Sequence, residues 1–192
     1  MAKKVITQKA RISVIKKRWY SLQAPNLFGN VVFGETIAAE PETLKGRGVR
    51  TNLSTILRGS KRQEVELYFK ITEVKGSECH TEFVSMEILP PHVRRIVKRA
   101  KKRMDDSFVV QTKDNVAVRL KPLLLVRENV QHSVLTSLRK QTQNFFTRVA
   151  KDTEFSEFVT KIITGELLRD LRGDVKKVYP VAAAEMRMLV RE

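Results

Sequence analysis

The segment "EVELYFKIT", residues 64–72, decides the fold class because its apolar side chains recur at every second position. These are Val65, Leu67, Phe69 and Ile71. Successive side chains of a strand point to opposite faces, so this period predicts a strand with one buried face. Four further segments extend the prediction to a sheet: 79–89, 107–112, 116–126 and 185–190. Asp114 and Asn115 tolerate the left-handed backbone of a hairpin turn between the second and third of them.

Three helical patterns follow toward the C-terminus. The first starts near Gln131 and places apolar residues on one side: Val134, Leu135, Leu138, Phe145, Phe146 and Val149. The second has apolar residues at i, i+3, i+4, i+7 and i+8 from Phe155 and ends at Gly165. The third, residues 166–178, is expected to be cut at Gly173. Strands first and helices mostly late predict the α+β class.

The charge of the chain is the strongest guide to its partners. The 192 residues include 37 Lys and Arg but 21 Asp and Glu, which gives a formal net charge of +16. Such an excess favours polyanionic partners. The one cysteine, Cys79, indicates a reducing compartment, and no apolar run reaches the roughly 18–20 residues that span a bilayer. We therefore expect a soluble cytoplasmic protein with no membrane partner.

The densest cationic segment is "HVRRIVKRAKKR", residues 92–103, which holds seven basic side chains and no acid. Pro90 and Pro91 suit the first turn of a helix through this block. On such a helix one narrow arc is apolar, and it comprises Val93, Ile96, Val97, Ala100 and Met104. Nearly all the remaining surface is basic, and it comprises Arg94, Arg95, Lys98, Arg99, Lys101, Lys102 and Arg103.

Three readings of this basic surface compete. A merely solvated helix usually mixes charge signs, and a membrane-surface helix needs a face rich in Trp, Phe or Leu. This apolar arc is small and aliphatic, so a phosphate backbone fits better. If five such side chains contact phosphates, the logarithm of the binding constant should fall with the logarithm of the salt concentration with a slope of about −3.5 to −4.5. We call this the logarithmic salt slope. Charge alone does not separate RNA from DNA.

Residues 1–18 form a basic N-terminal arm, and residues 19–192 are expected to form a single α+β RNA-binding domain. We expect this arm to contact RNA; the alternative is that it serves only as a solubilising tail. Trp19 is expected to stack on an unpaired base or to anchor the chain to the sheet. Gly46 lets the backbone of "LKGRG" approach phosphate closely. The RNA-binding candidates outside the basic block are therefore Lys3, Lys4, Lys9, Arg11, Lys16, Lys17, Arg18, Trp19, Lys45 and Arg47.

Catalytic and metal chemistry has little support in the sequence. His80, His92 and His132 lack the spacing of metal ligands. Cys79 and His80 are adjacent, so they point to opposite faces of a strand. We therefore expect no metal site, no cofactor and no enzymatic activity.

Several blocks, in order, resemble one family. The blocks are "WYSLQAPNLFGNVVFGET" at 19–36, "LKGR" at 44–47, "VKGSECHTEF" at 74–83, "TKDNVAVRL" at 112–120 and "VYP" at 178–180. Together they resemble the S-three-a-e (e-S-one) family of archaeal and eukaryotic small-subunit ribosomal proteins. Asn115 departs from the glycine often found in that hairpin. The end at Glu192, without the longer extension of many eukaryotic relatives, points to the archaeal type.

The resemblance implies a structural ribosomal protein with an antiparallel β-barrel-like core and attached helices. This agrees with the pattern read from the sequence, a basic helix inserted between strands and two or three helices toward the C-terminus. The resemblance also implies rRNA and neighbouring ribosomal proteins as partners, on the subunit platform near the 3′ end of the rRNA and the mRNA exit. Contact with mRNA at that exit belongs to the same expectation. The alternatives are a free RNA- or DNA-binding module of translation or chromatin, and a nuclease or RNA-modifying enzyme.

Overall fold

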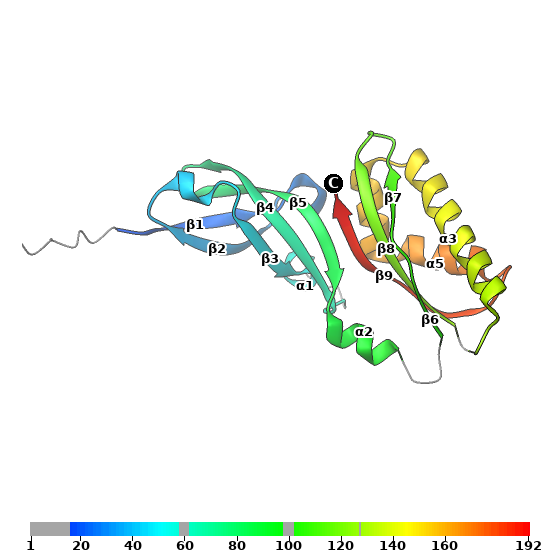
Figure 1. Ribbon diagram of the computed structural model, residues 1–192. Coiled ribbons are helices and arrows are strands. Elements are labelled where there is room, and N and C mark those ends of the chain that lie inside the picture. The colour runs from blue at the N-terminus through cyan, green and yellow to red at the C-terminus, as the bar shows by residue number, and fades with distance from the viewer. Residues whose placement is uncertain (1–15, 58–61, 98–101, 127) are drawn as a thin grey trace, which may run out of the picture.

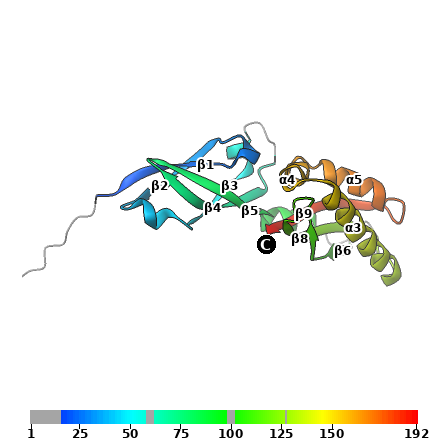
Figure 2. The same cartoon turned by 90° about the horizontal axis from the view of Figure 1, so that it is seen from above.

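The computed structural model describes residues 16–57, 62–97, 102–126 and 128–192. Two halves lie side by side along an elongated molecule (Figures 1 and 2). The first half is mostly strands, and the second half combines strands with three long helices. None of the helices in these ranges is long and apolar enough to cross a membrane.

The first half contains five strands, and the alternating segment at 64–72 lies in the longest hairpin. Its elements are β1 (Arg18–Gln23), β2 (Val32–Ala38), β3 (Gly48–Asn52), β4 (Val65–Lys75), β5 (Glu78–Ile88), η1 (Asn26–Phe28), η2 (Pro41–Leu44) and α1 (Leu53–Ile56). Strands β4 and β5 form an antiparallel hairpin whose turn uses Gly76 at φ 62°. Phe69 is fully buried and meets Phe28 and Phe83 edge-on at ring distances of 5.6 and 6.1 Å.

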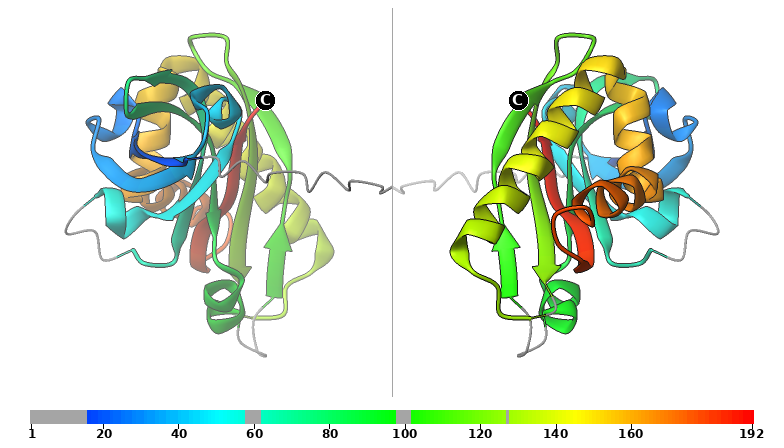
Figure 3. Two further views of the ribbon diagram at one scale, coloured as in Figure 1. Left: turned by 90° about the vertical axis from the view of Figure 1, so that its left-hand side faces the viewer. Right: turned by 90° about the vertical axis from the view of Figure 1, so that its right-hand side faces the viewer.

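The second half is a small sheet with helices on one face. Its elements are α2 (Pro90–Ile96), β6 (Lys102–Asp105), β7 (Phe108–Gln111), β8 (Ala117–Val126), α3 (His132–Asp152), α4 (Phe155–Thr164), α5 (Glu166–Val175) and β9 (Val181–Arg191). Helix α3 crosses β8 and β9 diagonally, beside α4 and α5 (Figure 3). Each long helix contributes at least one fully buried side chain to the core: Phe146 from α3, Phe158 from α4 and Leu171 from α5. The predicted helices over 131–149 and 155–164 are confirmed.

One sheet runs through both halves in the order β2-β1-β5-β9-β8-β6, with β4 and β3 beyond β5 and β7 beside β8. The link is short, because β5 and β9 pair only at 85–87 and 188–190. Most pairs are antiparallel, but β1 and β5 run parallel at 21–23 and 78–80. The α+β class is confirmed. The sheet does not close within the described residues, so the barrel-like core is not confirmed. The single-domain boundary at 19–192 stays a prediction.

The helix predicted through the basic block is wrong in its second half. Helix α2 ends at Ile96, and Lys102–Asp105 is strand β6, paired with β8; residues 98–101 lie outside the described residues. The physical reason is that Met104 lies opposite Leu124 and is buried in the sheet. A helix would also have stacked like charges with no acid to offset them.

Gly173 does not cut the third helix. Helix α5 continues to Val175 because Leu171 and Val175 are both fully buried on either side of the glycine. A glycine in a helix interior costs about 1 kcal/mol relative to alanine. Burial of the two apolar neighbours outweighs that cost.

Candidate nucleic-acid interface

Helix α2 carries two of the predicted arginines into solvent. Leu89 precedes the two prolines that begin the helix, and the buried Val93 fixes its inner face. Arg94 and Arg95 are exposed in its last turn, where positive charge is favoured by the helix dipole. Neither arginine forms an ion pair with an acid of the described residues. The charge of this turn is therefore available to an external anion.

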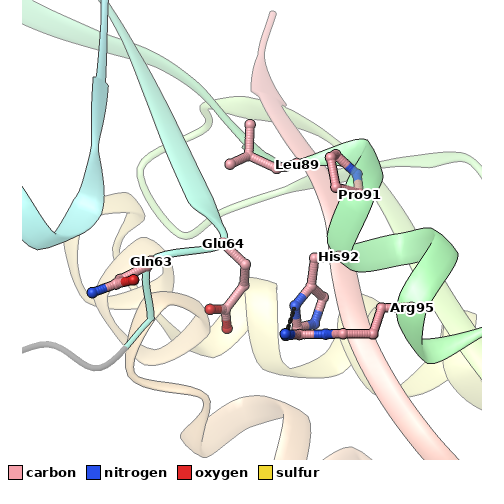
Figure 4. Close-up of a pocket in the computed structure, with 6 residues that line it drawn as sticks. All are labelled: Gln63, Glu64, Leu89, Pro91, His92 and Arg95. Atoms are coloured by element: carbon pink, nitrogen blue, oxygen red, sulfur yellow. Dashed lines mark hydrogen bonds between the residues drawn. The ribbon is translucent and has the colours of Figure 1, made fainter.

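A hollow lies between the start of β4 and α2. Its lining includes Glu64, His92 and Arg95, whose side chains face one another across it (Figure 4). Arg95 Nη2 lies 2.8 Å from His92 Nδ1. The contact with the His92 ring thus orients the guanidinium of Arg95, whereas Glu64 supplies a carboxylate on the opposite wall.

Three arginines from separate elements line a second hollow, and we name them the junction arginines: Arg94 of α2, Arg103 of β6 and Arg187 of β9. Glu87, Ile88, Pro90 and Val93 complete the lining. The hollow lies where β5 leads into α2 and the two halves diverge. The sequence predicted Arg94 and Arg103 but missed Arg187. The available signal was the alternation of apolar and polar residues over 185–190. It predicts a strand and places Arg187 on the face opposite Met186 and Met188.

Asp105 is the counter-charge of the junction arginines. Its Oδ1 accepts a hydrogen bond from Arg103 Nη2 at 3.0 Å and lies 3.7 Å from Arg187 Nη1. The hydrogen bond to Asp105 raises the pKa of Arg103, although partial burial opposes the shift. Asp105 and Glu87 together supply two carboxylates against the three junction arginines, so the hollow keeps an excess of one positive charge. Lys102, next in β6, is exposed and forms no ion pair with the described residues.

The described end of the N-terminal arm is exposed. Lys16, Lys17 and Arg18 are exposed, and Trp19 keeps 65% of its surface accessible beside Ile37 on the neighbouring strand. Tyr20, in contrast, is buried and anchors the chain. The structure does not bring this segment to the junction arginines, because it lies at the far end of the first half (Figure 1). Seven further predicted contacts lie outside the described residues, namely Lys3, Lys4, Lys9, Arg11, Lys98, Arg99 and Lys101.

Lys45 and Arg47 are engaged within the protein. Lys45 Nζ lies 3.3 Å from a carboxylate oxygen of Glu42. Arg47 Nη1 donates to Thr36 Oγ1 at 2.8 Å and to the carbonyl of Ile37 at 3.3 Å. Arg47 therefore helps to hold β2 beside the loop after η2, and an RNA contact by either residue stays a prediction.

The described residues contain no group of three or more His, Cys, Asp or Glu side chains that could hold a metal ion. Cys79 is buried in the small core beneath β1 and β2, and this burial raises the pKa of its thiol despite the nearby charge of Arg47. A buried thiol with a raised pKa is a poor nucleophile.

Residues 6–189 match the profile described as the Ribosomal S3Ae family. The chain belongs to this family. Its relatives include proteins named small ribosomal subunit protein eS1. The one from Nanoarchaeum equitans is 32% identical over 165 residues, covering 86% of this chain and 83% of the relative. The one from Halorubrum lacusprofundi is 32% identical over 177 residues, covering 92% and 82%.

A third relative, from Methanothrix thermoacetophila, is 30% identical over 171 residues, covering 89% of this chain and 81% of the relative. All three carry the same name and come from archaea. The resemblance read from the ordered sequence blocks is thereby confirmed, including the archaeal type. Membership of the S3Ae family gives the chain a structural role in translation.

Proposed function

We propose that this chain is a structural, non-catalytic component of the small ribosomal subunit that binds rRNA through its basic surfaces. In this proposal it lies on the platform, near the mRNA exit and the 3′ end of the rRNA, in the cytoplasm. Its partners are rRNA, neighbouring small-subunit proteins and mRNA at the exit. The names of the archaeal relatives support the ribosomal assignment.

The observation that carries the rRNA-binding part is the meeting of Arg94, Arg103 and Arg187 at one hollow. The guanidinium group of arginine presents a planar fork of donors that matches two phosphate oxygens, and folded RNA exposes such oxygens along its backbone. The three residues come from α2, β6 and β9, so the fold itself sets their spacing. Only Asp105 pairs with them among the described acids.

Trp19 and the basic residues before it provide a second contact in this proposal. An exposed aromatic ring beside Lys16, Lys17 and Arg18 suits an unpaired base whose backbone the cations neutralise. Because this segment and the junction arginines lie far apart on the molecule, a single short duplex would not serve both. A folded rRNA would.

Sedimentation and crosslinking test the proposal together. The full chain should co-sediment with small subunits in a gradient at physiological salt and should crosslink to rRNA in intact subunits. A pool that stays at the top of the gradient would refute the ribosomal assignment. Equal affinity for short duplexes and for structured rRNA would instead support a free nucleic-acid-binding module.

A further inference from the structure

We propose that Arg62, Arg169 and Arg172 form a pocket for one phosphate group of the RNA backbone. We name these residues the pocket arginines. The inference rests on the proposed function and adds a second, discrete contact on the α5 side of the molecule. It differs from the junction arginines in residues and in lining, and none of its members is among the RNA-binding residues predicted from the sequence.

The pocket arginines come from both halves of the molecule. Arg62 precedes β4 in the first half, whereas Arg169 and Arg172 lie one turn apart on α5 in the second half. Together they line a hollow of about 230 Å³, completed by Thr164, Gly165, Leu168, Ala184 and Glu185. An anion bound here would therefore contact both halves at once.

The charges in this hollow are unbalanced. Glu185 is the one acid in the lining, and it lies 3.4 Å from Arg62 Nη2 and 3.6 Å from Arg172 Nη2. Both distances exceed the roughly 2.7–2.9 Å of a close charge-assisted hydrogen bond. Arg169 is exposed and forms no ion pair with the described residues. Three guanidinium groups thus line a hollow whose one carboxylate is shared by two of them, which leaves an excess of two positive charges in the lining.

Two of the guanidinium groups are held in place by backbone carbonyls. Arg62 Nη1 donates to the carbonyl of Ile163 at 2.9 Å, at the end of α4. Arg172 Nη2 donates to the carbonyl of Ala184 at 3.3 Å. Donors fixed by the fold lose little conformational entropy when they bind an anion.

Two further details favour a ligand here. The Nε of Arg172 is the buried side-chain nitrogen that lacks a hydrogen-bond partner within the described residues. A buried donor without a partner is rare in folded proteins, and this one belongs to a side chain that lines the hollow. At Gly165, φ is +81°, and a Cβ placed there would lie 3.2 Å from Nη2 of Arg62. The glycine therefore lets the Arg62 guanidinium lie close against the backbone at the edge of the hollow.

Phosphate is the anion that this chemistry selects. Arginine forks bind phosphate oxygens in pairs, and several forks can share one tetrahedral group. The exposed Arg169 stands at the outer side of the hollow, where a nucleic-acid backbone can reach it. In this arrangement the phosphate replaces the long contacts that Glu185 makes with Arg62 and Arg172.

The test uses the full chain and inorganic phosphate as its probe. Thermal melting is followed in phosphate and in chloride at matched ionic strength for the wild type, Arg169→Gln and Arg148→Gln. Arg148 is an exposed arginine of α3 outside the pocket, so its variant is a control for the loss of one charge. We expect phosphate to raise the melting temperature of the wild type and the control equally, and that of Arg169→Gln by less than half as much.

Measuring the binding of rRNA to the same variants shows whether the bound phosphate belongs to the RNA backbone. Arg169→Gln should lower the logarithmic salt slope of rRNA binding by about 0.7 to 0.9, as for one lost contact. A full phosphate response in Arg169→Gln overturns the pocket, and an unchanged slope overturns its assignment to RNA. The proposed function is tested separately: it stands if Arg94→Gln weakens rRNA binding, whatever phosphate does at the pocket.

Discussion

Arg187 of β9 shares the carboxylate of Asp105 with Arg103 of β6, at 3.7 and 3.0 Å. The two arginines are 84 residues apart in the chain and meet because β6 and β9 flank the same strand, β8. Asp105 therefore has two opposed effects on the junction arginines. It holds them in one place, and it reduces the positive charge that they offer to phosphate.

The first prediction separates these effects with Asp105→Asn. Removing the carboxylate should strengthen rRNA binding about two- to five-fold at low salt, since an exposed ion pair contributes up to about 1 kcal/mol. Binding is measured by filter retention over a salt series. The same loss of negative charge at the exposed Asp152 is the control and should leave affinity nearly unchanged. Weaker binding in Asp105→Asn would mean that the aspartate is needed to position the arginines.

The second prediction concerns the cations of α2 and β6. The triple variant Arg94→Gln, Arg95→Gln and Lys102→Gln should lower the logarithmic salt slope by about 2 to 3, because three phosphate contacts are lost. All three side chains are exposed, so cooperative melting should persist, with a change within about 0.5 kcal/mol per site.

A matched control for that variant removes three exposed cations elsewhere, the lysines Lys113, Lys140 and Lys151. It has the same loss of net charge but leaves the junction arginines intact. An equal reduction of the slope in both variants would show that rRNA responds to total charge and not to this surface.

The periodic segments could be predicted from the sequence because their signal is local. The strand at 64–72 and the helices at 131–149 and 155–164 each have one apolar face that contacts a continuous core. Period alone then identifies the element, whatever it packs against. Asn115 likewise adopts φ 58°, the left-handed backbone that the residue types of Asp114 and Asn115 predict for the hairpin turn.

The basic block could not be assigned correctly by period. Val93, Ile96, Val97, Ala100 and Met104 satisfy a helical repeat as a set. The structure splits them, because Met104 pairs with a residue of β8 that is distant in sequence. Such pairing depends on the whole sheet, which no local pattern contains.

The same limit explains the site. Arg94 and Arg103 were candidates because they lie in a visible run of charge. Arg169, Arg172 and Arg187 stand among acids and apolar residues in the sequence, so nothing marked them. Arg62 ends the short basic segment "GSKR", residues 59–62, whose signal was weak. These arginines become neighbours only through the pairing of β9 with β5 and β8 and through the packing of α5 on β9.

The third prediction is a pH dependence of stability. A hydrogen bond from Lys177 is the main cause of a lowered pKa at Asp174, which also accepts a bond from Gln141 of α3 at 2.7 Å. A lowered pKa in the folded state stabilises the protein above the unfolded pKa, about 4. That contribution is lost as pH falls through the folded pKa.

Urea unfolding of the wild type and Asp174→Asn checks this sign. The free energy of unfolding should fall more steeply below about pH 4 in the wild type than in the variant. Asp170→Asn, at an exposed aspartate of the same helix, should keep the wild-type slope. Parallel slopes for the wild type and Asp174→Asn would remove Asp174 as a source of acid sensitivity.

The fourth prediction concerns Gly48 of β3, which lies beneath the ring of Tyr68 on β4. A Cβ built on Gly48 would lie 2.0 Å from the Tyr68 hydroxyl oxygen and 2.5 Å from Cζ, so Gly48→Ala must displace the ring. The displaced ring also leaves the guanidinium of Arg50, which stands 5.8 Å from its centroid. We expect Gly48→Ala to lower the free energy of unfolding by about 1 to 3 kcal/mol, in the range of overpacking substitutions.

Tyr68→Ala provides the decisive comparison, because it removes the ring that the new methyl group would meet. In the Tyr68→Ala background, Gly48→Ala should cost nothing or should stabilise the protein, since alanine restricts the unfolded chain more than glycine does. The double-mutant cycle therefore predicts a coupling of about 1 kcal/mol or more between the two positions, measured by urea unfolding. Additive effects would place the cost of Gly48→Ala in the backbone of β3 and not in contact with Tyr68. That result would be unexpected, because the backbone at Gly48, unlike that at Gly46, does not adopt a positive φ.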